Sequence, residues 1–225
     1  MAEKNSIFDM VGPIMIGPSS SHTAGVVRIG RVTGKLLGLE ADSAEITFYN
    51  SFARTFEGHG SDRAAAAGLM GMDTDDERIK EALAIAAELG MVLTWRAVMN
   101  AATHHPNTVT IKATSAGRRV ECTGISHGGG VISIIGIDGF KCNFSAQLHT
   151  LLVTAEDMRG SIAFISNIVA NDNANIATMT VDRAGKNGVA KLVLEMDSGL
   201  ENVTVEYLRH LKWVKEVNYI PQIEI

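Results

Sequence analysis

Seven residues near the start of the sequence combine four hydroxyl groups with an imidazole, groups that bind anions and move protons. Residues 17–23 read Gly-Pro-Ser-Ser-Ser-His-Thr and directly precede a helical pattern. The first N–H groups of a helix are unpaired and carry a partial positive charge, so they attract anions. One hydroxyl is enough for an N-cap, and the excess predicts a binding site for a small carboxylate. The donors are the hydroxyls of Ser19, Ser20, Ser21 and Thr23, beside the imidazole of His22.

A second glycine-rich turn repeats this arrangement of small residues, a histidine and a hydroxyl before a helix. Residues 58–62 read Gly-His-Gly-Ser-Asp and lead into an alanine-rich helical stretch at 63–69. Of the seven histidines, only His22 and His59 sit between glycines or hydroxyls at predicted helix starts. Ser61 and Asp62 also suit simple N-capping, and for Asp62 that alternative stays open. Paired histidine-bearing turns favour catalysis over mere binding, because a sensor needs donors but no base.

Composition limits the classes of protein to consider. The 225 residues are 46% hydrophobic and 20% charged, which is typical of a globular protein with one large or two small domains. A formal net charge of −5 disfavours nucleic acid or an anionic membrane as the main partner. No apolar run is long enough to span a membrane, and the first residues lack the order of a signal peptide. We therefore expect a cytoplasmic protein.

Cysteine usage bears on any metal centre. Cys122 and Cys142 are the only cysteines, and neither belongs to a CxxC motif or a Cys/His cluster. Two thiols do not supply the ligands of an iron–sulfur cluster or of a structural zinc site. We predict two free structural thiols and no metal site on this chain.

The order of elements predicts two α/β domains. In the first, a helix at 24–37 contains glycines suited to close backbone packing, and Thr74 and Glu77 fit a capping box for a further helix. From residue 150 the order β-α-β-β-α-β is ferredoxin-like, and we place the boundary close to Gln147, giving domains 1–147 and 148–225. The predicted strands are 44–49, 91–95, 108–113, 119–125, 131–137, 150–155, 176–182, 190–196 and 214–220; the predicted helices of the second domain are 160–171 and 202–211.

Four segments resemble the β chain of iron–sulfur-dependent L-serine dehydratase. They are residues 6–25, around the hydroxyl motif, and the stretches 58–63, 72–78 and 105–108. The resemblance covers nearly the whole chain. Members of that family commonly have Thr where this chain has Ser61, a change that keeps the hydroxyl and loses a methyl group. Residues 150–225 also resemble an ACT domain, a regulatory module that binds small molecules.

The resemblance implies a subunit of an L-serine ammonia-lyase, which forms pyruvate and ammonia without pyridoxal phosphate. In that family a [4Fe–4S] cluster, held by a separate α subunit, binds serine and helps its hydroxide leave. The implied roles are His59 as the likelier proton acceptor, with His22 and Ser61 also catalytic. The implied substrate-binding residues are Ser19, Ser20, Ser21, Thr23 and Gly60.

For the ACT part, the resemblance implies an amino-acid effector site and self-association. The matching positions are Asp157, Arg159 and Gly160, in the first strand-to-helix turn, together with Asn175. Many ACT sequences have Pro where this chain has Arg159, and dimerisation alone remains an equal alternative. A second reading of the whole chain is a non-catalytic amino-acid sensor or adaptor. A pyridoxal-phosphate lyase lacks a suitable lysine, and a metal hydrolase lacks a ligand cluster.

Overall fold

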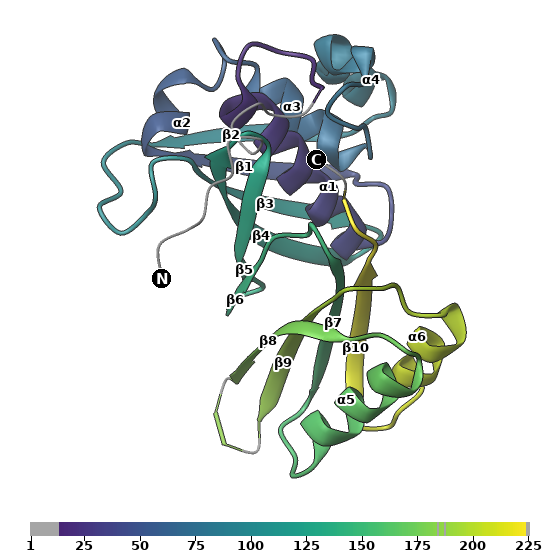
Figure 1. Cartoon of the computed structure of the whole chain (residues 1–225). Coiled ribbons are helices and arrows are strands. Elements are labelled where there is room, and N and C mark those ends of the chain that lie inside the picture. The colour runs from purple at the N-terminus through teal and green to yellow at the C-terminus, as the bar shows by residue number, and fades with distance from the viewer. Residues whose placement is uncertain (1–13, 184, 187, 224–225) are drawn as a thin grey trace. The chain divides into compact units, whose positions relative to one another are not determined.

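The computed structural model of the protein describes residues 14–183, 185–186 and 188–223 (Figure 1). They divide into two compact units, one up to Asp138 and the other from Gly139. The predicted boundary close to Gln147 falls after strand β6 (Phe140–Phe144) and stays a prediction. Residues 6–13, which belong to the first segment that carries the resemblance, lie outside the described residues.

A mixed β-sheet forms the centre of the first unit. Within this unit the strands follow the order β2-β1-β3-β4-β5. Strand β1 pairs parallel with β2 and antiparallel with β3, and β3, β4 and β5 follow as an antiparallel meander. The predicted strands of this part are all confirmed, with ends that differ by a few residues. Their bounds are β1 Ser43–Tyr49, β2 Val92–Val98, β3 Thr108–Ser115, β4 Arg118–Gly128 and β5 Val131–Ile137.

Two helices of the first unit pack backbone against backbone. Helix α1 (Gly25–Leu37) covers β3 and β4, and α3 (Ser61–Leu69) lies beside it. A Cβ at Gly68 would lie 2.1 Å from the carbonyl oxygen of Val27, and a Cβ at Gly30 would lie 2.9 Å from that of Ala65. Only glycine fits such an approach. The predicted packing against another backbone is confirmed for Gly30 and Gly34, whereas a Cβ at Gly25 would meet the side chain of Ser126. The helices run the same way, which brings their first turns to one end.

The structure changes the predicted helix starts. Ser19 is the N-cap, and a π-helical turn, Ser20–Ala24, precedes α1, so the hydroxyls lie within the first turn. The predicted capping box at Thr74 is wrong. Asp76 caps the next helix by accepting a hydrogen bond from the backbone N–H of Arg78, because the Thr74 hydroxyl donates to the carbonyl of Ile14 instead. A 3-10 turn, Glu77–Glu81, then leads into α4 (Ala82–Glu88), and a short helix that was not predicted, α2 (Asn50–Thr55), follows β1.

The second unit has the predicted ferredoxin-like order. The chain runs β7-α5-β8-β9-α6-β10, and the four strands form an antiparallel sheet in the order β10-β7-β9-β8. Leu151, Leu194, Ile165 and Leu208 are among the fully buried residues between sheet and helices. The α/β fold class is thus confirmed. The bounds are β7 His149–Glu156, α5 Ser161–Asn171, β8 Ile176–Arg183, β9 Val189–Met196, α6 Asn202–Arg209 and β10 Val214–Ile220.

None of the helices in the described ranges is long and apolar enough to cross a membrane.

Candidate active site

The first turn of the α1 helix is a compact cluster of hydroxyls around one imidazole. The Ser19 hydroxyl caps the turn by accepting a hydrogen bond of 3.1 Å from the backbone N–H of His22. The Ser21 hydroxyl lies 2.9 Å from Nδ1 of His22 and 3.3 Å from the Ser19 hydroxyl. The Ser20 hydroxyl points elsewhere and accepts a hydrogen bond of 3.1 Å from the backbone N–H of Gly129. The turn therefore fixes the His22 ring through Nδ1 and directs Nε2 away from the hydroxyls.

The second turn is built by α2 and by one glycine. The backbone N–H groups of His59 and Ser61 donate to the carbonyls of Thr55 and Phe56, at the end of α2. Gly60 has φ +67°, a left-handed conformation that side-chain-bearing residues rarely adopt, and α3 begins directly after it. The left-handed backbone of Gly60 thus lets the chain turn from His59 into the helix.

Two hydroxyls join the turns. The Thr23 hydroxyl donates to the backbone carbonyl of His59 at 2.9 Å, and the buried Ser61 hydroxyl donates to the backbone carbonyl of His22 at 2.8 Å. Each hydroxyl has a single proton, and both protons are used in these bonds. The predicted site residues on the two turns are thereby brought together. Thr23 and Ser61 hold the turns in register rather than offering a donor to a ligand.

The two imidazoles form one unit. The ring centroids of His22 and His59 lie 4.8 Å apart, and the edge of the His22 ring packs against Phe52 at 4.7 Å between centroids. Burial, and secondarily the neighbouring His59, lower the pKa of His22 from its ordinary value of 6.5. His22 is therefore neutral at pH 7. A pair so close accepts one proton far more readily than two.

Each imidazole also presents a ring nitrogen without a partner. Nε2 of His22 and Nδ1 of His59 are buried, and among the described residues neither has a hydrogen-bond partner. Buried polar atoms in proteins are nearly always paired, since an unpaired one costs about 1–3 kcal/mol. Two such atoms on adjacent rings, next to a helix start and its serine hydroxyls, mark a place where a polar ligand could complete the hydrogen bonding.

A glycine turn far along the chain supports the hydroxyl cluster, and sequence reasoning missed it. Gly128, Gly129 and Gly130 all have positive φ, and the N–H of Gly129 reaches Ser20. The fully buried side chain of Arg28, on α1, donates to the carbonyl of Gly130 and so ties this turn to the helix. Burial lowers the pKa of Arg28 to about 10, so its guanidinium stays charged at neutral pH. The run of three glycines was the available signal.

Phe52 was missed as well. It is fully buried in α2 and meets both His22 and Phe48 in edge-to-face contacts. The available signal was the group of phenylalanines at 48, 52 and 56, although Phe48 lies on β1 and not on the helix. The carboxylate of Asp62 accepts a hydrogen bond from the N–H of Arg63 in its own turn.

The cysteines do not fit an iron–sulfur cluster. Cys122 and Cys142 are both buried, and they belong to different compact units. Burial raises the pKa of Cys142 to about 12, whereas a cluster ligand must be a thiolate. Within the described part of the chain, no group of three or more His, Cys, Asp or Glu residues is placed to hold a metal ion.

The second unit has its own cavity, of about 470 Å³, at the turn between β7 and α5. Asp157, Arg159 and Gly160 line it, together with residues of β8 and β9. Asn175 does not line this cavity; its side-chain amide donates to the carboxylate of Asp197 at 2.6 Å. The structure thus groups three of the four predicted effector residues, and the role of all four stays a prediction.

The lowered pKa of His22 predicts how stability depends on pH. The unfolded chain protonates this histidine near pH 6.5, while the folded chain resists until a lower pH. The neutral His22 should therefore not reduce the free energy of unfolding above about pH 7. As the pH drops below 6.5 toward the pKa of His22 in the folded state, the free energy of unfolding should fall. Urea unfolding between pH 5 and 8 should show a flatter profile in His22→Gln, with His210→Gln as the exposed control. An unchanged slope in His22→Gln would contradict the assignment.

The fold and this site define an α/β protein in which two adjacent histidines lie at neighbouring helix starts, followed by a ferredoxin-like unit. The family model for the serine dehydratase beta chain matches residues 6–92. A "Probable L-serine dehydratase, beta chain" from Bacillus subtilis is 41% identical, covering 96% of this chain and 97% of the relative. The L-serine dehydratase beta chain of Peptoniphilus asaccharolyticus is 33% identical, covering 87% and 88%. The chain therefore belongs to the L-serine dehydratase beta-chain family.

The chain is also similar to a solved structure. This is the ACT domain from GTP pyrophosphokinase of Chlorobium tepidum, at 20% identity and a TM-score of 0.26, covering 32% of this chain and 94% of that one. The ferredoxin-like fold of the second unit rests on its own strand order.

Proposed function

We propose that this chain is the β subunit of an L-serine ammonia-lyase that converts L-serine to pyruvate and ammonia without pyridoxal phosphate. The observation that carries the proposal is the pair of adjacent imidazoles, each with a buried, unpartnered nitrogen, at a hydroxyl-lined helix start. Elimination from serine needs a base for the α-proton and a receptor for the carboxylate. Both are available at this one place.

The carboxylate of serine fits the first turn of the helix. Its N–H groups and partial positive charge favour an anion. The Ser20 hydroxyl accepts from Gly129, which leaves its own proton to donate to the substrate. Ser19, Ser20 and Ser21 are thus the substrate-binding residues of the proposal, whereas Thr23, Ser61 and Gly60 position the two turns.

The α-proton goes to His59 in this proposal. Its Nδ1 is buried and without a partner, and the neighbouring His22 is kept neutral, so a proton arriving on His59 meets no like charge. His22, held by Ser21 through Nδ1, offers Nε2 to the amine or carboxylate of the substrate.

The departure of the serine hydroxide requires a Lewis acid that the described residues of this chain do not provide. We assign it to a [4Fe–4S] cluster on a separate α subunit, since Cys122 and Cys142 do not make a ligand set. The surface around the two histidine-bearing turns then faces that subunit. A cytoplasmic location remains part of the proposal.

Substitution of Ser21 distinguishes a turn that takes part in catalysis from a turn that only caps the helix. In Ser21→Ala the His22 ring loses its hydrogen bond of 2.9 Å and keeps only the 3.4 Å contact with the Ser19 hydroxyl, so kcat/KM for serine should fall about tenfold to a hundredfold with unfolding little changed. Asp76→Ala is the matched control: it removes an N-cap that is not part of the proposed site, which costs about 1 kcal/mol of stability. Steady-state kinetics and urea unfolding on both variants give the comparison. A Ser21→Ala variant that loses only stability would show that the turn is a cap.

A sensor or adaptor role is the second candidate, and the cavity at Asp157–Gly160 favours it. If that cavity takes serine as an effector, calorimetry on this chain should show saturable L-serine binding, weaker for D-serine. Arg159→Ala should weaken it, while Lys212→Ala, an exposed change elsewhere in the unit, should not. No binding at millimolar serine would leave self-association as the role of this unit.

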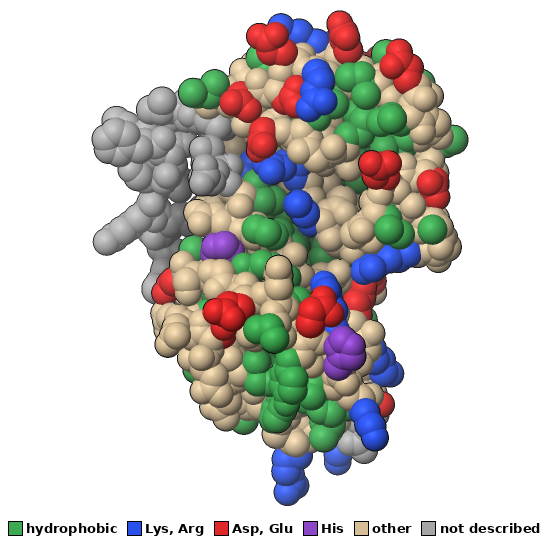
Figure 2. All heavy atoms as spheres, turned by 90° about the vertical axis from the view of Figure 1, so that its right-hand side faces the viewer, with side chains coloured by type: hydrophobic (Ala, Val, Ile, Leu, Met, Phe, Trp, Pro, Cys, Tyr) green, Lys and Arg blue, Asp and Glu red, His purple; other side chains and the backbone are tan. Residues whose placement is uncertain are grey.

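Self-association has a surface available. Figure 2 shows hydrophobic side chains gathered over the helices of the second unit. They include Ile162 and Phe164 on α5 and Val203 and Tyr207 on α6, which are 40–67% exposed. Apolar side chains grouped in this way are typical of protein interfaces.

Assembly with a partner tests the proposed function. The purified chain alone should form no pyruvate from L-serine. Mixed under anaerobic conditions with a cluster-loaded α subunit, it should do so, and hydroxylamine, which traps pyridoxal phosphate, should leave the rate unchanged. Serine deamination by this chain without iron would overturn the two-subunit proposal.

A further inference from the structure

A second cavity of the first unit lies at the opposite end of α1 from the histidines. It has a volume of about 460 Å³, within the range of small-molecule sites. Helices α1 and α3 both end beside it, at Leu37 and Leu69, and Leu89, which directly follows α4, also lines it. The ends of three helices therefore meet around one cavity.

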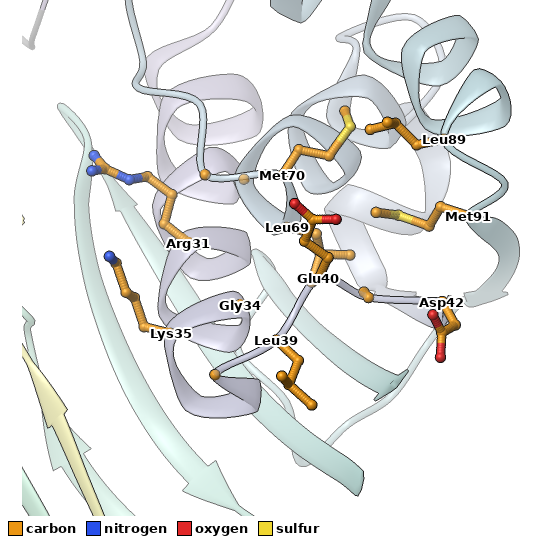
Figure 3. Close-up of a pocket in the computed structure, with 14 residues that line it drawn as sticks. Arg31, Gly34, Lys35, Leu39, Glu40, Asp42, Leu69, Met70, Leu89 and Met91 are labelled. Atoms are coloured by element: carbon orange, nitrogen blue, oxygen red, sulfur yellow. The ribbon is translucent and has the colours of Figure 1, made fainter. Parts of the chain in front are cut away.

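The charge of this cavity favours a cation. The last carbonyls of a helix carry partial negative charge, and here two full-length helices and a shorter one contribute. The carboxylates of Glu40 and Asp42 line the same space. Arg31 and Lys35 line the cavity as well, and Figure 3 shows them on the other side of α1 from Glu40 and Leu69. Arg31 is paired with Asp73, so Lys35, Glu40 and Asp42 leave the lining with a net negative charge.

The rest of the lining is apolar. Leu69, Met70, Leu89 and Met91 form one wall, and Leu39 lies near Gly34 (Figure 3). Leu39 is 49% exposed and Leu89 66% exposed, large fractions for leucines that border a cavity. Gly34 lets the end of α3 approach α1 at the edge of the cavity, because a Cβ there would lie 3.0 Å from the carbonyl oxygen of Leu69. A ligand that covers these side chains removes apolar surface from water.

We propose that this cavity binds a primary aliphatic amine, with its ammonium group at Glu40 and the helix C-termini and its hydrocarbon body on the leucine and methionine wall. Opposite charge and an apolar body are both needed, since an exposed carboxylate alone binds an ammonium weakly. The inference uses none of the residues of the proposed active site, so it stands or falls independently of the serine dehydratase activity.

Three probes of equal length test the charge. Hexylamine, hexanol and hexanoate share the hydrocarbon body and differ in the head group. In calorimetry on the full chain, hexylamine should bind more tightly than hexanol, and hexanoate should not bind measurably. In ¹H–¹⁵N spectra, hexylamine should shift the amide signals of Gly34, Gly38 and Gly71, which line the cavity. Equal binding of hexanoate, or no binding of hexylamine, would overturn the proposal.

Matched variants test the residues. Glu40→Gln should weaken hexylamine about threefold to fivefold and leave hexanol unchanged. Glu81→Gln removes the same charge outside the cavity and should change neither probe. Leu89→Ala should weaken both probes, because it removes apolar wall. Hexylamine affinity unaffected by Glu40→Gln, or shifts confined to the hydroxyl turn, would contradict the assignment.

Discussion

Replacing His59 by Asn is expected to lower kcat of the assembled enzyme by about 10²–10⁴, with the cluster spectrum unchanged. Asn has nearly the same size and keeps a polar group at the ring position, but it accepts no proton. The surrounding hydrogen bonds use the backbone of His59, whose carbonyl accepts from Thr23 and whose N–H donates to Thr55. The fold should therefore survive the change. Kinetics at saturating serine measure the effect.

Two further histidine variants serve as the comparison and the control for His59→Asn. His22→Asn should mainly raise KM if His22 orients the substrate, so the two histidines should differ in their balance of kcat and KM. His210→Asn, on the exposed end of α6, should leave both constants unchanged. Near-normal turnover by His59→Asn would remove His59 from the mechanism.

Gly68→Ala should have the second large effect, on stability and activity together. The new Cβ would lie 2.1 Å from the carbonyl oxygen of Val27 and 2.8 Å from Cα of Gly30, and backbone atoms cannot swing aside. The free energy of unfolding should fall by about 1–3 kcal/mol, after the helix propensity gained with alanine. Because α1 and α3 carry the two site turns, kcat/KM should fall as well.

Gly185→Ala is the control for that experiment, since a Cβ there meets no atom within 4 Å. Urea unfolding at constant pH and the serine assay on the same preparations separate the two effects. A Gly68→Ala protein as stable as the wild type would mean that the α1–α3 contact is looser than the structure has it.

The elements with strong local patterns were predictable. Strands β5 and β10 were predicted at their observed bounds. Their alternating apolar residues stop at glycine, proline or charged turns, which marks the strand ends in the sequence. The ferredoxin-like order followed from the same signal. The hydroxyl turn and the Gly58–Asp62 turn were also visible, since each concentrates unusual residue types within a few positions.

Long-range features were not predictable from local patterns. Helix α2 has six residues, and its start depends on Asn50, whose side chain bonds to the backbone of Ala101 and His104 about fifty positions away. Gly129 reaches Ser20 over 109 positions, and Arg28 reaches Gly130 over 102. Such contacts form only when the sheet is assembled, so the spacing of residues along the chain gives no sign of them.

The sequence pattern also does not show which partners the hydroxyls of the site have, and the roles predicted for Thr23 and Ser61 stay predictions. Thr23 and Ser61 look like ligand donors, because each is a hydroxyl beside a histidine. In the structure both hydroxyls donate hydrogen bonds to backbone carbonyls of the opposite turn. A hydroxyl's partner depends on which turn lies opposite, and that is a property of the α1–α3 packing.

The central claim is that His59 takes the α-proton of serine, and the kinetic isotope effect on that proton tests it most directly. The assembled wild-type and His59→Asn enzymes would be compared with L-serine and with L-serine carrying deuterium at Cα. Without its base, proton removal should become slower than every other step, so His59→Asn should show a larger primary isotope effect on kcat/KM than the wild type. An isotope effect and a rate that the substitution leaves unchanged would contradict the account.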